Sequence, residues 1–401
     1  IHASLTIIIY NFLKKIENNS LTILLSLIFF LAQTNFSSAF AIDTAGQLLV
    51  TFFGVISFIY IYEFVQTKKK IDLVFSYIFV VFAFLSKEIA VTFVILNIFT
   101  LIYYSNFNFI FKLKKISEKE VILNSLIFIL IVVIYLAFRS NLGATWQPSN
   151  IGTDRYSLGI GFNLIKNFTL YFLSVVNPID NLFFYLSFQN RNILILLFII
   201  VFFIFYLAYL TRYFIKYFNS EIFFRFLILI ISCFPIILLN KIGELYTYSS
   251  TFFFIFLLQK LIPKNKVPIL LILILLNLIS SINKIKSVDL ISNQKKEIDL
   301  LFNQIKGEIK DKDIYVLHNK SQYKYSYYHL PSFDWIYPIF QFKKDYGKAY
   351  NLIFDKKKLN EIKINNSIVI ISSENKEKDF SLRPKTCFYF SYSSNKTICN
   401  F

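Results

Sequence analysis

Two short polar stretches lie between apolar segments and carry the side chains best suited to chemistry. The first is Ser86-Lys87-Glu88, and the second is Glu244–Ser250, which contains Tyr246 and Tyr248. A charge inside a bilayer costs roughly 2.5–3.5 kcal/mol on insertion scales, so charges at the end of an apolar helix indicate a water-accessible site. The alternative is that these side chains simply meet the membrane interface, where tyrosines also gather.

The cations near these stretches suit a phosphate group. Lys87 and Arg139 can hold phosphate oxygens through charge-assisted hydrogen bonds, and Arg155 is a further cation in the same predicted set of loops. Together they predict a binding site for a lipid-linked phosphate or diphosphate that carries a sugar.

The acids and tyrosines could serve the sugar end of such a ligand. Glu88 and Glu244 could orient the cations, bind sugar hydroxyl groups or hold a divalent metal ion. Tyr246 and Tyr248 are two positions apart, a spacing that suits ring stacking or hydroxyl donation on an extended segment.

Composition places these stretches in a membrane protein. Apolar residues make up 56% of the 401 residues, charged residues make up 16%, and the mean hydropathy is +0.56. Several apolar stretches approach the length needed to cross a hydrocarbon core of about 30 Å. The sequence therefore predicts an all-α polytopic protein with ten membrane helices, near His2–Leu13, Leu21–Gln33, Ala45–Val65, Ile71–Leu85, Glu88–Tyr104, Val121–Phe138, Asn192–Thr211, Ile222–Leu239, Ser250–Ile262 and Val267–Ile282.

Positive charges predict the orientation of these helices, because cytoplasmic loops collect Lys and Arg. With Phe162–Val176 as a helix lying at the membrane interface, both polar stretches face outward. The loops predicted inside hold Lys14, Lys15, Lys68, Lys69, Lys70, Lys112, Lys114, Lys115, Lys119, Arg212, Lys216, Lys260, Lys264 and Lys266. The loops predicted outside hold Lys87, Arg139, Arg155, Lys166, Arg191 and Lys241.

The composition changes after the last apolar helix. Residues 283–401 are rich in Lys, Asn, Ser and Tyr, with strand-like runs at Ile314–His318, Ile368–Ser372 and Thr386–Tyr392 and a helical pattern at Leu290–Ile309. We therefore expect a multi-spanning domain at 1–282 and a small α/β domain at 283–401 on the outer face, without the reaction centre.

The net charge indicates which class of partner the protein binds, and two of its cysteines bear on its compartment. The formal charge of +18 fits anionic membrane lipid or lipid phosphate better than nucleic acid, because half of the basic residues decorate membrane loops. Cys387 and Cys399 flank a predicted hairpin, and both a disulfide and free thiols are open there. Cys233 is expected to be a packing residue.

The polar stretches also carry a family resemblance. Ser86-Lys87-Glu88 between apolar helices resembles the Ser-Lys-Glu signature of bacterial GT-C glycosyltransferases, relatives of the protein O-mannosyltransferases and the aminoarabinose transferase of lipid A. Glu244–Ser250 is similar to their later Glu-Arg-Tyr-x-Tyr-x-Pro-Ser signature. Tyr135–Arg139 and Asn163–Pro178 are similar to the region between, so the resemblance covers most of residues 1–262.

The resemblance implies a transferase that moves a sugar from a polyprenyl-phosphate donor to a protein, lipid or glycan acceptor. It implies a bacterial inner (plasma) membrane location, transfer on the outer face, a periplasmic C-terminal domain, and catalytic roles for Glu244 and Glu88. A first-loop carboxylate usually acts as general base or positions a metal. The chain is expected to start within the second helix of the family, so Asp43 is the nearest substitute, with helix capping as its alternative role.

The sequence departs from the family pattern at several positions. Leu245 and Ser249 stand where the family has Arg and Pro, and the Pro and Glu expected around Asn35 and Ala39 are missing. Two other functions remain open. A glycan polymerase or ligase would use a large outer loop with paired arginines, for which Arg139 and Arg155 are the nearest candidates. A transporter or flippase of lipid-linked sugars would show charges within its helices or repeated halves, and the sequence offers only Arg225, near a helix start.

Overall fold

The computed structural model describes residues 1–17, 20–35, 45–106, 117–142, 161–179, 193–234, 236–238, 244–263 and 267–285, together with five strands between 313 and 400. The chain divides into two compact units, Ile1–Lys284 and Ile285–Phe401.

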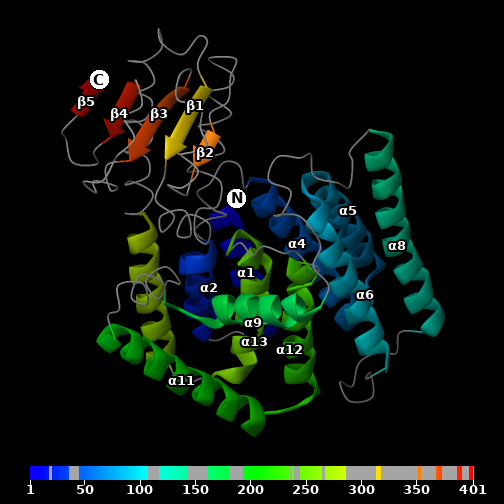
Figure 1. Ribbon diagram of the computed structural model, residues 1–401. Helices are drawn as coiled ribbons and strands as arrows, with labels where there is room; N and C mark the ends of the chain where they lie inside the picture. Colours follow the sequence, from blue (N-terminus) through cyan, green and yellow to red (C-terminus); the bar gives the residue numbers. More distant parts are fainter. Residues whose placement is uncertain are drawn as a thin grey trace. The chain divides into compact units, whose positions relative to one another are not determined.

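The first unit is built from α-helices (Figure 1). They are α1 (His2–Ile16), α2 (Leu21–Leu31), α4 (Ala45–Thr67), α5 (Lys70–Ser86), α6 (Val91–Asn106), α8 (Glu118–Asn141), α9 (Phe162–Val176), α11 (Ile193–Lys216), α12 (Ser220–Ser232), α13 (Tyr248–Leu261) and a final helix at Val267–Ile285. Short 3-10 turns, η1 (Gln33–Asn35), η3 (Glu88–Ala90), η4 (Ile236–Leu238) and η5 (Glu244–Thr247), lie between some of them.

Five of the described helices are long and apolar enough to cross a membrane. These spans are Ala45–Thr67, Glu88–Ser105, Glu118–Asn141, Leu197–Lys216 and Val267–Ile285. Each of the ten predicted segments contains a helix, but α1, α2, α5, α12 and α13 are shorter than a full span. The helix predicted to reach Leu239 ends at Ser232, shortly before Pro235, which lacks the backbone donor that a helix interior needs.

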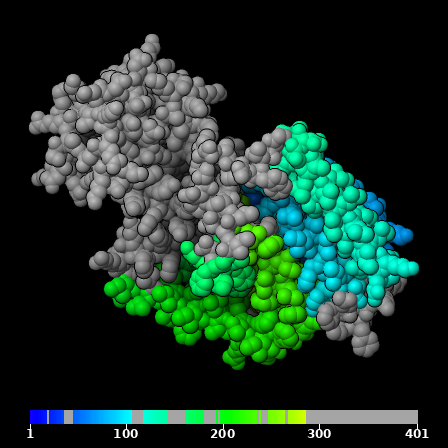
Figure 2. Space-filling view, turned by 45° about the vertical axis from the view of Figure 1, so that its right-hand side comes forward, coloured from blue at the N-terminus to red at the C-terminus, as the bar shows by residue number. Residues whose placement is uncertain are grey.

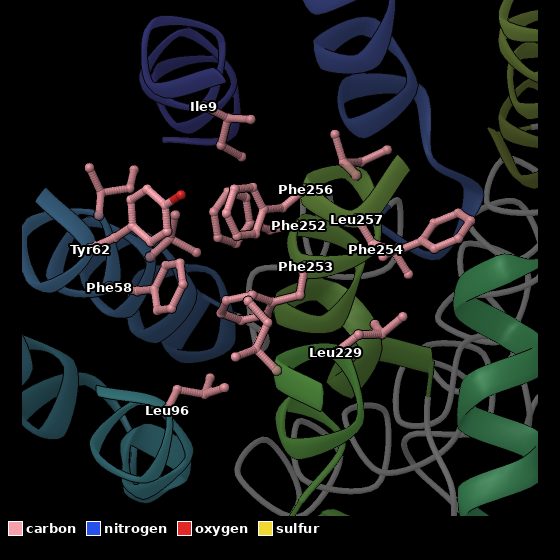
Figure 3. Close-up of a cluster of buried hydrophobic side chains, with 14 of the residues drawn as sticks. Ile9, Phe58, Tyr62, Leu96, Leu229, Phe252, Phe253, Phe254, Phe256 and Leu257 are labelled. Carbon is pink, nitrogen blue, oxygen red and sulfur yellow. The ribbon is translucent and has the colours of Figure 1, made fainter. Parts of the chain in front are cut away.

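Aromatic side chains from α4 and α13 form the centre of the first unit (Figure 3). Phe58 and Phe253 meet edge to face with ring centroids 4.9 Å apart, and Tyr62 contacts Phe256 in the same geometry at 5.5 Å. Such tilted pairs add attraction beyond the burial of apolar area. The abundant phenylalanine of this sequence therefore packs α4 against α13, the helix that begins within the second polar stretch.

Gly54 lets α4 and α6 approach closely. A Cβ atom at this buried position would overlap the ring of Phe93, which is itself 1% exposed. We expect Gly54→Ala to lower the free energy of unfolding by about 1–3 kcal/mol through overpacking, as measured by denaturation in detergent. Adding Phe93→Leu should recover part of the loss. A single variant more stable than the parent, as helix propensity by itself favours, would contradict this packing.

Two helices present mostly apolar surface to the outside. Side chains of α8 and α11 remain largely exposed, among them Leu123, Ile134, Leu194 and Phe205. Figure 2 shows both helices running along the visible surface, α8 in cyan-green and α11 in green. An exposed apolar helix of this length is typical of a segment that faces lipid.

Helix α9 runs crosswise to α12 and α13 (Figure 1). Asn167, which is 2% exposed, donates from Nδ2 to the Ile237 carbonyl oxygen at 2.9 Å, and Tyr171 is buried. Phe162 and Ile165 are exposed. The helix predicted here is present, and its crosswise path fits a helix with one buried face and one exposed face. Its position at a membrane interface stays a prediction.

The described part of the second unit is a sheet with strand order β2-β1-β3-β4-β5. The strands are β1 (Asp313–Leu317), β2 (Asn351–Ile353), β3 (Ser367–Ser372), β4 (Thr386–Phe390) and β5 (Thr397–Asn400). The pairs β1–β2, β1–β3 and β3–β4 are parallel, and β4–β5 is antiparallel. Strands lie at the three places expected, and the helix expected at Leu290–Ile309 lies outside the described residues.

Candidate functional site

The Ser86-Lys87-Glu88 stretch separates two helices. Helix α5 ends at Ser86, Lys87 has an extended backbone with φ −167° and ψ 149°, and η3 begins at Glu88. The turn stays compact because the Lys87 N–H donates to the Ala83 carbonyl at 3.0 Å. Both charged side chains are therefore held at the end of the α5–α6 helix pair.

Glu88 forms an ion pair with Arg139 near the end of α8. Arg139 Nη1 lies 3.1 Å from Glu88 Oε2 and donates to the Tyr135 hydroxyl at 3.2 Å. The Arg139 side chain is 30% exposed and that of Glu88 is 56% exposed. Because an exposed pair contributes little net stability, a phosphate could draw Arg139 away from Glu88 at small cost.

Lys87 contacts the second polar stretch directly. Its Nζ atom lies 5.3 Å from the centre of the Tyr246 ring, within the range of a cation–π interaction. Gly46 in the first turn of α4 completes the contact, since a Cβ atom there would stand 3.2 Å from the Ser86 carbonyl and 3.9 Å from Lys87 Cδ. Three segments that are distant in sequence meet around Lys87.

The two tyrosines of the second stretch have different surroundings. Tyr246 is half-buried beside Tyr171 and Cys233. Tyr248 is fully buried at the start of α13, where its hydroxyl is 2.6 Å from Nδ1 of His2. The stretch is a 3-10 turn followed by a helix rather than an extended segment, so only Tyr246 lies beside Lys87.

Three predicted site residues lack a described side chain. Glu244 begins η5, so its backbone precedes Tyr246 by two residues, but its side chain lies outside the described residues. Asp43 and Arg155 lie outside them entirely. The described residues contain no group of three His, Cys, Asp or Glu side chains that could hold a metal ion.

A buried polar cluster next to η5 was not singled out from the sequence. Lys284, which is 4% exposed, donates to the carbonyl and side-chain oxygens of Gln33 at 2.9 and 2.6 Å. Asn277 Oδ1 accepts from the Gln33 N–H at 3.2 Å. η1, which begins at Gln33, packs against η5. The sequence signal was a lysine directly after an apolar helix, a position that usually lies at an interface.

A small cavity adjoins this polar cluster at Asn277. It measures about 20 Å³, and its mostly apolar lining includes the polar residues Thr34, Asn177, Tyr206, Thr251 and Asn277. Its size admits about one water molecule. The residues that line it do not include Lys87, Glu88, Arg139 or Tyr246, so the candidate site is a separate, open group of side chains.

Ion pairs also connect helices at the far end of α4. Lys15 pairs with Glu63 at 2.7 Å, and Lys260 pairs with Glu17 at 3.3 Å. With a rise of 1.5 Å per residue, Glu63 lies about 25 Å along α4 from Gly46. The ends of α1, α4 and α13 therefore meet on the side of the bundle opposite the candidate site.

Arg225 is the most buried charge of this far end. It is 0% exposed and donates to Glu221 Oε1 at 2.6 Å, to the Phe256 carbonyl at 2.5 Å and to Gln259 Oε1 at 3.1 Å. Its guanidinium carbon also lies 3.8 Å from the Phe256 ring centre. From the sequence, Arg225 was only a charge near a helix start. In the structure its hydrogen bonds connect α12 to α13, the two helices that flank η5.

These observations describe a helical protein with several apolar helices long enough for a membrane, and with Lys87, Glu88, Arg139 and Tyr246 gathered at one end of the bundle. Comparison of the chain with protein-family models, with curated proteins and with solved structures gives no match.

Proposed function

We propose that this chain is a membrane glycosyltransferase that moves a sugar from a polyprenyl-phosphate donor to a protein, lipid or glycan acceptor. The observation that carries the proposal is the meeting of the two signature-like stretches through Lys87 and Tyr246. A cation beside an aromatic ring at a helix end offers one contact for phosphate and one for a sugar face.

The roles of the remaining residues follow from this proposal. Lys87 and Arg139 hold the donor phosphate, and Glu88 keeps Arg139 in place until the donor binds. Glu244 is assigned the acid–base role, with Asp43 as a second carboxylate and Arg155 as a further phosphate ligand. Tyr246 contacts sugar or acceptor, whereas burial of Tyr248 supports a role in positioning η5 through His2.

The proposed location is a bacterial inner membrane with the candidate site and the small α/β domain outside. The distribution of positive charge between the two ends of α8 supports this orientation. Lys119, which belongs to the lysine-rich set of loops, lies in the first turn of α8, and Arg139 lies in its last turn beside Glu88. The end with fewer loop cations is the expected outer end.

Two positions on α8 test this orientation. In a variant without native cysteines, Ser140→Cys should react with an impermeant thiol reagent added to intact cells, and Lys119→Cys should react only after the membrane is opened. Both parent side chains are exposed, so burial does not hide either one. Labelling of Lys119→Cys from outside would overturn the orientation.

Transfer from a lipid-linked sugar tests the activity. The full-length protein, including any residues that precede Ile1, is reconstituted in vesicles with a labelled polyprenyl-phosphate sugar and candidate acceptors. Glu244→Gln keeps the side-chain shape and removes its charge, so we expect loss of turnover with unchanged folding. Movement of donor across the vesicle membrane without sugar release would instead support a flippase.

A further inference from the structure

The last two strands of the chain set two cysteines opposite each other. β4 and β5 are antiparallel, and their register pairs Cys387 with Cys399. Residues directly opposite in such a pair share a face of the sheet, with Cβ atoms about 4.5–5.5 Å apart. Their Cα atoms are about 4.5 or 5.5 Å apart, according to the hydrogen-bonding pattern. Both Cα spacings lie within the roughly 4.4–6.8 Å that disulfides span, and the Cβ atoms reach the roughly 3.5–4.5 Å of a disulfide from the short end of their range.

We propose that Cys387 and Cys399 form a disulfide that joins β5 to β4. The sequence left this pairing and free thiols equally open, and the strand register favours the pairing. The third cysteine of the chain is placed differently. Cys233 is 2% exposed, and its Sγ lies 3.6 Å from the Leu229 carbonyl and 3.7 Å from the Ser250 hydroxyl, inside the helical unit.

The disulfide has a structural purpose at this position. β5 is the final strand in the order β2-β1-β3-β4-β5, so it is paired on one side within the described sheet. A covalent link to β4 ties this edge strand to the sheet.

The bond forms by thiol–disulfide exchange with a disulfide-bearing oxidant. One cysteine, as a thiolate, attacks the oxidant and releases one of its sulfurs as a thiol, which leaves a mixed disulfide. The second cysteine then displaces the other sulfur. One oxidant disulfide and two protein thiols become one protein disulfide and two oxidant thiols. This step rests on the outer placement in the proposed function, because disulfides persist in oxidising compartments.

The sequence provides a direct assay. Trypsin cleaves after Lys385 and Lys396, so Cys387 lies in the peptide 386–396 and Cys399 in the separate peptide that begins at Thr397. Thiols are blocked with N-ethylmaleimide as cells are harvested, and the full-length protein is digested without reductant. We expect both peptides as one linked species that separates on reduction. Alkylated Cys387 and Cys399, or a linked dimer of two chains, would overturn the proposal.

Two variants and a second incubation show why the two peptides are found linked or unlinked. Cys233→Ser should keep the linked species, and Cys399→Ser should abolish it and leave Cys387 alkylated. If harvested protein carries free thiols, the proposal fails. Incubation of the purified chain with oxidised glutathione then separates a wrong register, which gives no link, from a reducing location, which gives the link. Neither measurement involves sugar transfer, so failure of the transferase proposal would be seen separately.

Discussion

Changing Glu221 to glutamine is expected to lower the free energy of unfolding of the helical unit by about 3–5 kcal/mol. Arg225 is fully buried, and Glu221 is the acid in ion-pair contact with it at 2.6 Å among the described residues. Removing the carboxylate leaves the guanidinium charge without its counterion where water cannot reach it. The change is measured by denaturing the protein in detergent and following the circular-dichroism signal of its helices.

A double variant separates loss of charge from loss of packing. Glu221→Gln with Arg225→Met replaces the buried pair by uncharged groups, and such replacements are often neutral or stabilising. We therefore expect it to regain most of the stability lost in the single variant. Glu63→Gln is the matched control, because the Lys15 side chain of that pair is 62% exposed, and such pairs contribute about 0–1 kcal/mol. Equal losses in the control and in Glu221→Gln would contradict the role of burial.

Replacing Lys87 with alanine is expected to weaken binding of a polyprenyl-phosphate sugar roughly 10- to 100-fold. A hydrogen bond from a charged group contributes about 1.5–3 kcal/mol, and Lys87 is placed for one at the turn between α5 and η3. The measurement is donor affinity of the full-length protein in lipid nanodiscs.

Matched variants make this result specific. Lys166→Ala removes an exposed lysine from α9 and should leave affinity unchanged. Tyr246→Phe keeps the ring that contacts Lys87, while Tyr246→Ala removes it and should weaken binding in the same direction as Lys87→Ala. Normal donor affinity in Lys87→Ala would remove Lys87 from the site and leave the two polar stretches as interfacial residues.

The sequence by itself determined the elements of the helical unit. Apolar runs predicted a helix in every proposed membrane segment, because a backbone in lipid must satisfy its hydrogen bonds internally. The interruption at Ser86-Lys87-Glu88 predicted the break between α5 and α6, where Lys87 is extended. The local pattern did not determine where the helices end. The segment predicted to reach Leu239 ends at Ser232, and α13 begins at Tyr248 where Ser250 was predicted.

The candidate site required the tertiary structure. Sequence spacing treated Tyr246 and Tyr248 as equivalent, but the turn η5 and the packing of α13 leave one beside Lys87 and bury the other against His2. The pairing of Glu88 with Arg139, and of Arg225 with groups on α13, likewise depends on which helices are neighbours. A local pattern sets which face of a helix is apolar. The partner that covers that face is chosen by how all the helices pack together, through contacts such as Gly54 against Phe93.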